Sequence, residues 1–291
     1  MRHDARVVQT ASDIRLVVNA DDFGMSPAIS RGILRAHRDG IVTSTSLLGN
    51  CADLPAAGAL LAATPTLGVG VHLALCGGRP VADPASVPSL VGPDGAFFPR
   101  GQDFITAWVR GRVSAADVER EIDAQVARIR DAGLTVDHLD THHHLGFLPV
   151  VGRAVEAVAR RHGIAGIRSA VERPTLAWVT DPRRGVEAGL LTGLAWLTRR
   201  QLGARRHGPQ SWGYVESGHL DEIRILEIVG RLGPGPHELI CHPGEAEAEG
   251  YPIDHAARYQ RTEELASLTS AKVRRALERR NVELCRWGDL V

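Results

Sequence analysis

Short apolar runs alternate with amphipathic stretches along most of the 291-residue chain. The first apolar run, residues 14–20, is followed at residues 26–40 by apolar positions at helical spacing that close on a glycine. Further apolar runs lie at residues 41–49, 67–75, 135–144, 165–170 and 237–244, and further helical patterns at 53–65, 114–133, 150–163, 220–235 and 262–281. Strands that alternate with helices are typical of parallel sheets covered by helices. The pattern therefore predicts an α/β fold: a single domain over residues 1–291, built as a distorted (β/α) barrel.

Two stretches interrupt this alternation. Residues 77–101 hold five prolines and several glycines, which predicts a long loop. Long loops inside compact domains are often functional, and we expect this one to act as a lid over the mouth of the barrel. Residues 175–217 are irregular, and their basic stretch at 199–208 is interpreted as a solvated face rather than a binding site.

The composition and charge exclude several classes of protein. Lysine plus arginine equals aspartate plus glutamate, 34 each, so the basic excess typical of nucleic-acid-binding proteins is absent. No apolar run approaches the roughly 20 residues of a membrane-spanning helix, and the N-terminal segment lacks the apolar core of a signal peptide. The four cysteines form no CxxC pair, so we expect reduced thiols. We therefore predict a cytoplasmic protein with no nucleic-acid partner and no transmembrane segment.

Polar side chains gather where the predicted strands end. The four places are the pair Asp21 and Asp22, then His72, then residues 140–144 with three consecutive histidines, and finally His242. In a parallel barrel the carboxyl ends of the strands converge on one mouth, where active sites lie. Strand alternation would place Asp140, His142 and His144 on one face and His143 on the other. Only part of the histidine cluster is then expected to face a single metal ion.

Each of these residues has an ordinary structural interpretation when it is taken alone. An Asp-Asp pair more often forms a solvated turn or a helix N-cap, a single histidine is more often a satisfied core residue, and a histidine tract can be exposed. Their joint occurrence at four strand ends favours a site. Two adjacent carboxylates resist joint ionisation without a cation, whereas two imidazoles and one carboxylate leave a divalent metal open to water and substrate. One aspartate can then bind the metal while the other serves as a base.

The segments that carry these residues resemble those of the YdjC-like carbohydrate deacetylases, a family that includes diacetylchitobiose deacetylases and hopanoid-associated deacetylases. The matching segments are VVNADDFGMS, GIVTSTSLL, GVGVHLAL with GGRPV, HLDTHHHLGFLP and ELICHPGE, and they run from about residue 16 to residue 245. The resemblance implies a distorted (β/α) barrel like that of polysaccharide deacetylases. It also implies hydrolysis of the acetyl group from an N-acetylated amino sugar, either a chito-oligosaccharide or an N-acetylglucosaminyl glycoconjugate such as a hopanoid-linked lipid.

The same resemblance implies roles for five residues. One divalent metal ion, with magnesium and zinc both open, is held by Asp22, His72 and His142. Asp21 is then the general base, and His242 is the candidate general acid that protonates the departing amine.

Further residues are expected around this centre. Asp140 is expected to orient a ligand or an acid, Arg168 to reach a sugar hydroxyl or the carbonyl, and His144 to bind substrate or support the ligands. The family's third motif usually has a further histidine where this chain has Gly146, which we expect to alter the pocket wall and spare the metal. The resemblance also suggests a homodimer and, as substrate, a small saccharide or a glycolipid.

Two other functions fit the same residues. The first is a metal-dependent hydrolase of another bond, such as a phosphoester, although such enzymes mostly use two metals and more carboxylates. The second is a non-catalytic sugar-binding protein that contains a metal, which would not need Asp21 as a base beside the ligand. Release of phosphate instead of acetate would identify the first. An Asp21→Asn protein that binds sugar normally and loses no turnover would support the second.

Overall fold

A computed structural model describes residues 13–168, 208–247 and 258–290, with a few single positions between 172 and 196. The basic stretch at 199–208 therefore lies almost entirely outside the described residues. Among the helices that are described, none is both long enough and apolar enough to cross a membrane. A single domain over residues 1–291 and a cytoplasmic location stay predictions.

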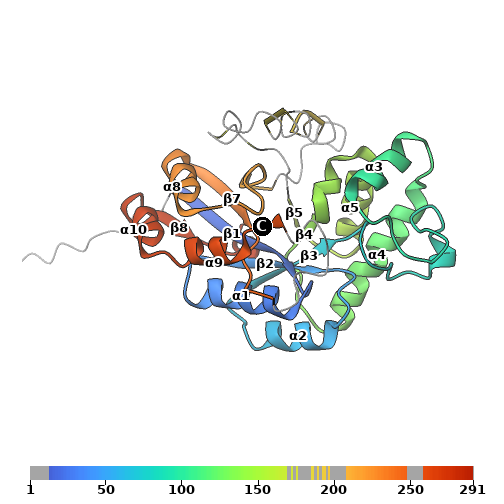
Figure 1. Ribbon diagram of the computed structural model, residues 1–291, viewed down its shortest axis with the longest axis horizontal. Coiled ribbons are helices and arrows are strands. Elements are labelled where there is room, and N and C mark those ends of the chain that lie inside the picture. Colours follow the sequence, from blue (N-terminus) through green and yellow to red (C-terminus); the bar gives the residue numbers. More distant parts are fainter. Residues whose placement is uncertain are drawn as a thin grey trace, which may run out of the picture.

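The predicted α/β fold is confirmed, and its centre is a parallel sheet. Within the described residues the strand order is β5-β4-β3-β2-β1-β7-β6, with β8 paired to β1 beside this path (Figure 1). The strands are β1 (Ile14–Phe23), β2 (Ser44–Leu48), β3 (Gly68–Leu73), β4 (His138–Thr141), β5 (Gly166–Ile167), β6 (Gln210–Trp212), β7 (Gly235–Cys241) and β8 (Val282–Leu284). Arg168, directly after the edge strand β5, forms ion pairs with Asp21 on β1 and Glu238 on β7. The edge strand therefore faces the middle of the sheet, as in a distorted, open barrel.

The helices begin where the sequence supplies caps. They are α1 (Pro27–Arg38), α2 (Leu54–Ala62), α3 (Gly101–Val109), α4 (Ala115–Asp131), α5 (Pro149–Arg161), α8 (Glu222–Arg231), α9 (Arg261–Leu268) and α10 (Ala271–Arg279). Ser26, Ser114 and Asp221 cap α1, α4 and α8, each accepting a hydrogen bond from a backbone amide in the first turn. In Figure 1, α4 and α5 pack together on the β3–β5 side, and α8 packs with α10 on the β7 side.

Five features differ from the sequence predictions. Helix α3 and the strands β6 and β8 were not predicted; both strands have only three residues, too few to show an alternating pattern. The single helix predicted at 262–281 is wrong. This segment forms two helices. The first helix ends at its C-cap Thr269, and Ser270 caps α10 by accepting a hydrogen bond from the backbone amide of Lys272. The strand predicted at 135–144 ends at Thr141.

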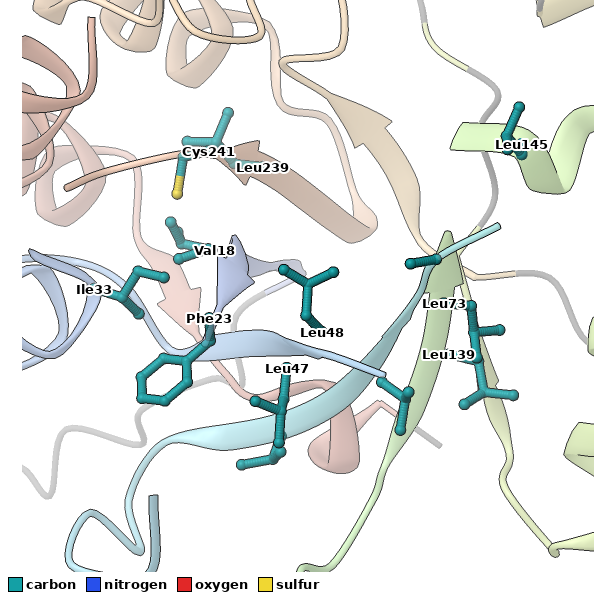
Figure 2. Close-up of a cluster of buried hydrophobic side chains, with 14 of the residues drawn as sticks. Val18, Phe23, Ile33, Leu47, Leu48, Leu73, Leu139, Leu145, Leu239 and Cys241 are labelled. Carbon is teal, nitrogen blue, oxygen red and sulfur yellow. The ribbon is translucent and has the colours of Figure 1, made fainter. Parts of the chain in front are cut away.

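The two faces of β1 bury different kinds of side chain. Leu16, Val18 and Ala20 belong to the large apolar cluster between sheet and helices, to which Phe23 and Ile33 also contribute (Figure 2). The alternate residues face the barrel interior, where Val17 packs with Cys285 and Trp287, and Asn19 and Asp21 join a hydrogen-bonded polar network. The apolar face holds the sheet and helices together, and the interior face supports the strand ends.

Gly70 gives room for a buried imidazole in this interior. It pairs with His138 across β3 and β4, and a β-carbon at Gly70 would lie 2.3 Å from His138 Cε1. We expect Gly70→Ala to lower the free energy of unfolding by about 1–3 kcal/mol in denaturant titration, because the ring must move. Gly58→Ala is the matched control: nothing lies within 4 Å of the point that its methyl group would occupy in α2, and better helix propensity should stabilise the protein by about 0.5–1 kcal/mol. Equal effects of the two changes would contradict the packing described.

The loop at residues 77–101 is attached to α4. Glu121 accepts hydrogen bonds from the backbone amides of Val81 and Ala82, both at 2.9 Å, and Asp117 accepts one from Ser89 at 3.0 Å. Of this loop, only its last residue, Gly101, lines the cavity at the strand ends. The interpretation as a lid over the mouth is therefore not supported in this conformation.

Candidate metal centre

A bulge at the end of β1 turns two neighbouring carboxylates into the same cavity. The pairing register with β2 shifts between Ala20 and Phe23, and Asp22 has a left-handed backbone with φ 72°. A bulge re-aims side chains that would otherwise alternate, and positive φ is strained for an aspartate. Asp21 and Asp22 both line the cavity as a result. The bend lies at Asp22, inside the strand.

Asp22, His72 and His142 form a triangle of potential metal ligands. Asp22 Oδ1 lies 3.5 Å from His72 Nε2 and 3.4 Å from His142 Nδ1, and the two nitrogens are 3.1 Å apart. Ligand atoms about 2.1 Å from a tetrahedral ion stand about 3.4 Å apart. Asp22 Oδ1 is buried and accepts no hydrogen bond from the described residues. The donor set and its unsatisfied oxygen therefore fit one divalent metal ion.

Asp140 holds the ring of His72 from behind. Its Oδ1 lies 2.7 Å from His72 Nδ1, which leaves Nε2 pointing to Asp22 and His142. Carboxylates commonly orient metal-binding imidazoles in this way. Burial lowers the pKa of His72, but Asp140 and Asp21 raise it further, to about 9. Asp140 thus lies where it could orient His72, and its role stays a prediction.

Arg168 lies behind the candidate base. Its Nη1 and Nη2 donate to Asp21 Oδ2 and Oδ1, both at 2.7 Å, and its Nε donates to Glu238 at 2.9 Å. Burial raises the pKa of Asp21, but the charge and hydrogen bonds of Arg168 together with the nearby His72 lower it, so the net pKa lies below its ordinary value. The Arg168 side chain is buried and is not among the cavity-lining residues. The structure therefore favours a role in holding Asp21 over the expected contact with a sugar hydroxyl.

Arg261 holds the candidate metal ligand and was missed by the sequence argument. Its Nη2 donates to Asp22 Oδ2 at 2.7 Å. Burial raises the pKa of Asp22, but Arg261, His142 and His242 together lower it more, so the pKa of this carboxyl is held well below its usual range. In the sequence, Arg261 precedes an amphipathic helix, where an arginine is ordinarily exposed. No signal in the sequence distinguishes it.

His242 directly follows β7 and faces Asp21 across the cavity. Its Nε2 lies 4.0 Å from Asp21 Oδ2, and its buried Nδ1 has no hydrogen-bond partner among the described residues. Burial lowers the pKa of His242 to about 4, against the opposing charges of Asp21 and Asp22. A general acid at this position must therefore acquire its proton during the reaction.

The three consecutive histidines form a turn, so the alternation argument for them is wrong. The strand ends at Thr141. Within the following 3₁₀ segment, His142–Phe147, the backbone is kinked at His143 and His144, which are left-handed with φ 54° and 52°. The left-handed backbone brings all three rings to the cavity wall, but only His142 belongs to the ligand triangle. His144 lies edge-on to Tyr214 with ring centroids 4.5 Å apart, and burial lowers the pKa of its imidazole to about 3.

The cavity has a volume of about 380 Å³ and combines polar and apolar walls. It is lined by Asp21, Asp22, His72, Gly101, Gln102, Ile105, His142, His143, His144, Leu145, Phe147, Tyr214, Val215, Ser217, His219, His242, Arg258 and Tyr259. Gly146 is not part of this wall. A β-carbon there would lie 3.1 Å from Thr141 Oγ1, so the expectation that Gly146 alters the pocket wall is not supported.

Comparison with known proteins agrees with this architecture. The model of the YdjC-like protein family matches residues 15–279. A carbohydrate deacetylase of Geobacillus stearothermophilus is 34% identical over 94% of this chain and 96% of its own length. A carbohydrate deacetylase of Mus musculus is 33% identical over 95% of each chain. The crystal structure of a proposed cellobiose-phosphate cleavage protein from Enterococcus faecalis V583 aligns with a TM-score of 0.78 and 27% identity, covering 96% of this chain and 100% of that one.

These matches extend over nearly the whole length of the chain and of its relatives. They include every strand end that supplies a residue to the candidate site, from Asp21 to His242. The chain belongs to the YdjC-like protein family.

Proposed function

We propose that the protein is a metal-dependent carbohydrate deacetylase that removes the acetyl group from an N-acetylated amino sugar. The observation that carries the proposal is the ligand triangle of Asp22, His72 and His142 beside the ionised Asp21 in one open cavity. The curated relatives named carbohydrate deacetylase support the substrate class. Two imidazoles and one carboxylate favour zinc, while magnesium prefers oxygen ligands. A divalent ion bound there would polarise the amide carbonyl and lower the pKa of a water molecule.

The protein's own residues would then move two protons. Arg168 keeps Asp21 ionised, so Asp21 Oδ2 can accept the proton of the water that attacks the amide carbon. His242 Nε2, 4.0 Å from that oxygen, would relay a proton to the amide nitrogen as the carbon–nitrogen bond breaks. Acetate and a free amino sugar are the products. A small saccharide or the sugar of a glycolipid fits a cavity of about 380 Å³.

Acetate release tests the proposal directly. Purified protein supplied with zinc or magnesium is expected to release acetate from diacetylchitobiose or an N-acetylglucosaminyl lipid. His142→Ala should abolish release, because one of three ligands is lost. His37→Ala is the matched control: this half-buried histidine bonds Val42 O and Thr66 away from the cavity and should leave release unchanged. Metal-loaded wild-type protein that releases no acetate from any N-acetyl sugar would contradict the proposal.

The alternatives have less support. Among the described residues the second potential ligand group, Asp21, His72 and Asp140, shares His72 with the first, and its members already bond one another or Arg168. A second metal of the kind that many phosphoesterases use is therefore not favoured. A purely sugar-binding role would not need Asp21 as a base beside the ligand Asp22. A homodimer stays a prediction.

A further inference from the structure

Arg261, the first residue of α9, connects two parts of the site that come from different strands. Its side chain is 0% exposed, with Nη2 donating to Asp22 Oδ2 at 2.7 Å and Nη1 donating to the carbonyl of His242 at 3.3 Å. A guanidinium is a rigid planar fork, so one side chain can hold two acceptors at a fixed separation. Asp22 ends β1 and His242 follows β7, and Arg261 is bonded to both.

The rest of the α9 region fixes His242 as well. Glu264, one turn after Arg261, accepts a hydrogen bond from the His242 backbone amide at 2.6 Å. Both backbone groups of His242 are therefore held by side chains of α9. The Tyr259 ring fills the remaining side, with its centroid 5.0 Å from that of the imidazole and 5.1 Å from Arg261 Cζ. The imidazole is thus placed by its backbone and by packing, while its Nδ1 makes no hydrogen bond with the described residues.

Asp22 needs a positively charged partner because its carboxylate is buried on a strained backbone. Its φ of 72° is unfavourable for a residue with a side chain, and its carboxylate is buried. Arg261 occupies Oδ2, which leaves Oδ1 alone to face the two imidazoles. Without the guanidinium, a buried carboxylate would be free to rotate or to present both oxygens.

We propose that Arg261 is a positioning residue that presents a single oxygen of Asp22 to the metal and keeps this ligand in register with His242. The proposal rests on the proposed function, since it takes Asp22 as a metal ligand. It assigns to α9, a helix without a ligand of its own, the task of aligning the metal side and the proton-transfer side of the site.

Zinc affinity of Arg261→Met tests the proposal without relying on activity. Competition with a chromophoric chelator is expected to show zinc binding weakened about 10–100-fold, the usual cost of losing a residue that supports a ligand. At saturating zinc, kcat should remain reduced because His242 has lost its carbonyl contact, whereas KM should change less than about twofold. A lysine has three donors but no planar fork, so Arg261→Lys cannot hold the two acceptors at a fixed separation and should show smaller losses of zinc affinity and of kcat.

Arg280→Met is the matched control. Arg280 also bonds two acceptors, the carbonyls of Val229 and Leu232 at 2.6 and 2.7 Å, but it joins α10 to α8 away from the cavity. This variant should be less stable than wild type in thermal unfolding and bind zinc with wild-type affinity.

The outcomes separate the two proposals. Wild-type zinc affinity and kcat in folded Arg261→Met would overturn the positioning role. Tighter zinc binding by this variant would also overturn it, because it would show that Arg261 acts only by opposing the charge of the cation. If Arg261→Met does not fold, Arg261→Lys is the deciding variant, and wild-type zinc affinity and kcat in Arg261→Lys would overturn the positioning role. Wild-type protein that binds zinc but releases no acetate would instead contradict the proposed function, and the affinity comparison would still stand.

Discussion

Asp21→Asn is expected to reduce acetate release by about 10²–10⁴-fold while zinc affinity stays within about twofold of wild type. The two adjacent aspartates are distinguished by the lone pairs that remain to them. Asp22 gives Oδ2 to Arg261 and turns Oδ1 to the imidazoles. Asp21 accepts hydrogen bonds at Oδ1 from Asn19 and Arg168, but at Oδ2 only from Arg168. Oδ2 therefore retains a lone pair for a proton.

The size of the effect follows from the charge of the base. An asparagine keeps the shape of Asp21 and one oxygen for Arg168, but an amide does not accept a proton near neutral pH. Because Arg168 already bonds Asp140 and Glu238, the variant should fold. Turnover and zinc affinity of the same preparation are the measurements.

Asp103→Asn is the control for the chemical change itself. Asp103 lies on α3 next to the cavity-lining Gln102, and its partly exposed carboxylate pairs with Arg100 at 2.9 Å. The Asp103→Asn variant should keep turnover within about twofold of wild type, because exposed ion pairs contribute little. Comparable turnover in Asp21→Asn and Asp103→Asn would mean that another group takes the proton.

The strand ends were predictable because apolar runs and polar termini are local features of the sequence. Asp21, Asp22, His72, His142 and His242 all follow or close such runs, and parallel strands bring their carboxyl ends together. All five line one cavity in the structure. The side-chain directions were less predictable. Alternation failed where the backbone left the strand conformation, at the bulge and in the histidine turn, because no residue type in either segment requires positive φ.

The supporting charges could not be predicted for a different reason. Arg261, Glu264 and Glu238 are buried only because the fold brings distant segments together, such as Arg261 and Asp22, 239 positions apart. Charged residues are almost never fully buried unless they are paired, and a pair so far apart leaves no local pattern. Such residues are found only once the strands and helices are placed in space.

Arg168→Met is expected to lower the free energy of unfolding by about 3–5 kcal/mol, the cost of breaking a buried ion pair by removing one partner. One guanidinium serves three buried carboxylates, with contacts of 2.7 Å to Asp21, 2.7 Å to Asp140 and 2.9 Å to Glu238. Its loss would leave three buried carboxylates in the barrel interior without their arginine partner. Urea titration measures the change.

Arg161→Met provides the matched comparison. Arg161 also contacts two carboxylates, Glu119 and Asp123, but it is 50% exposed. Solvent screens such pairs, so the loss should be much smaller than that of Arg168→Met. A similar loss for Arg161→Met and Arg168→Met would show that burial of the Arg168 cluster does not set its energy.

The loss of stability in Arg168→Met should depend on pH. Burial alone would raise the pKa values of Asp21 and Asp140, but in the wild type Arg168 and His72 together lower both below their ordinary values. These two groups therefore stabilise the fold above their unfolded pKa, near 4, and this contribution is lost as pH falls through the lower folded values. Without Arg168 burial would raise both pKa values, so Arg168→Met should lose stability as pH rises above about 4. The difference between variant and wild type should therefore grow as pH rises, from its smallest value well below pH 4 to its largest near pH 7.

Glu238→Gln identifies which carboxylate carries the cost. Burial raises the pKa of Glu238 despite Arg168, and its Oε2 has no hydrogen-bond partner among the described residues. Glutamine keeps an oxygen for the Arg168 and Trp287 donors, so the single change should cost less than about 1 kcal/mol. In the double variant with Arg168→Met it should restore about 1–2 kcal/mol, because one of three unpaired charges is gone. If the stability changes of the two single variants simply add in the double variant, Glu238 does not interact with the other two carboxylates. Arg168 would then be needed mainly to hold Asp21 and Asp140 at the mouth of the barrel.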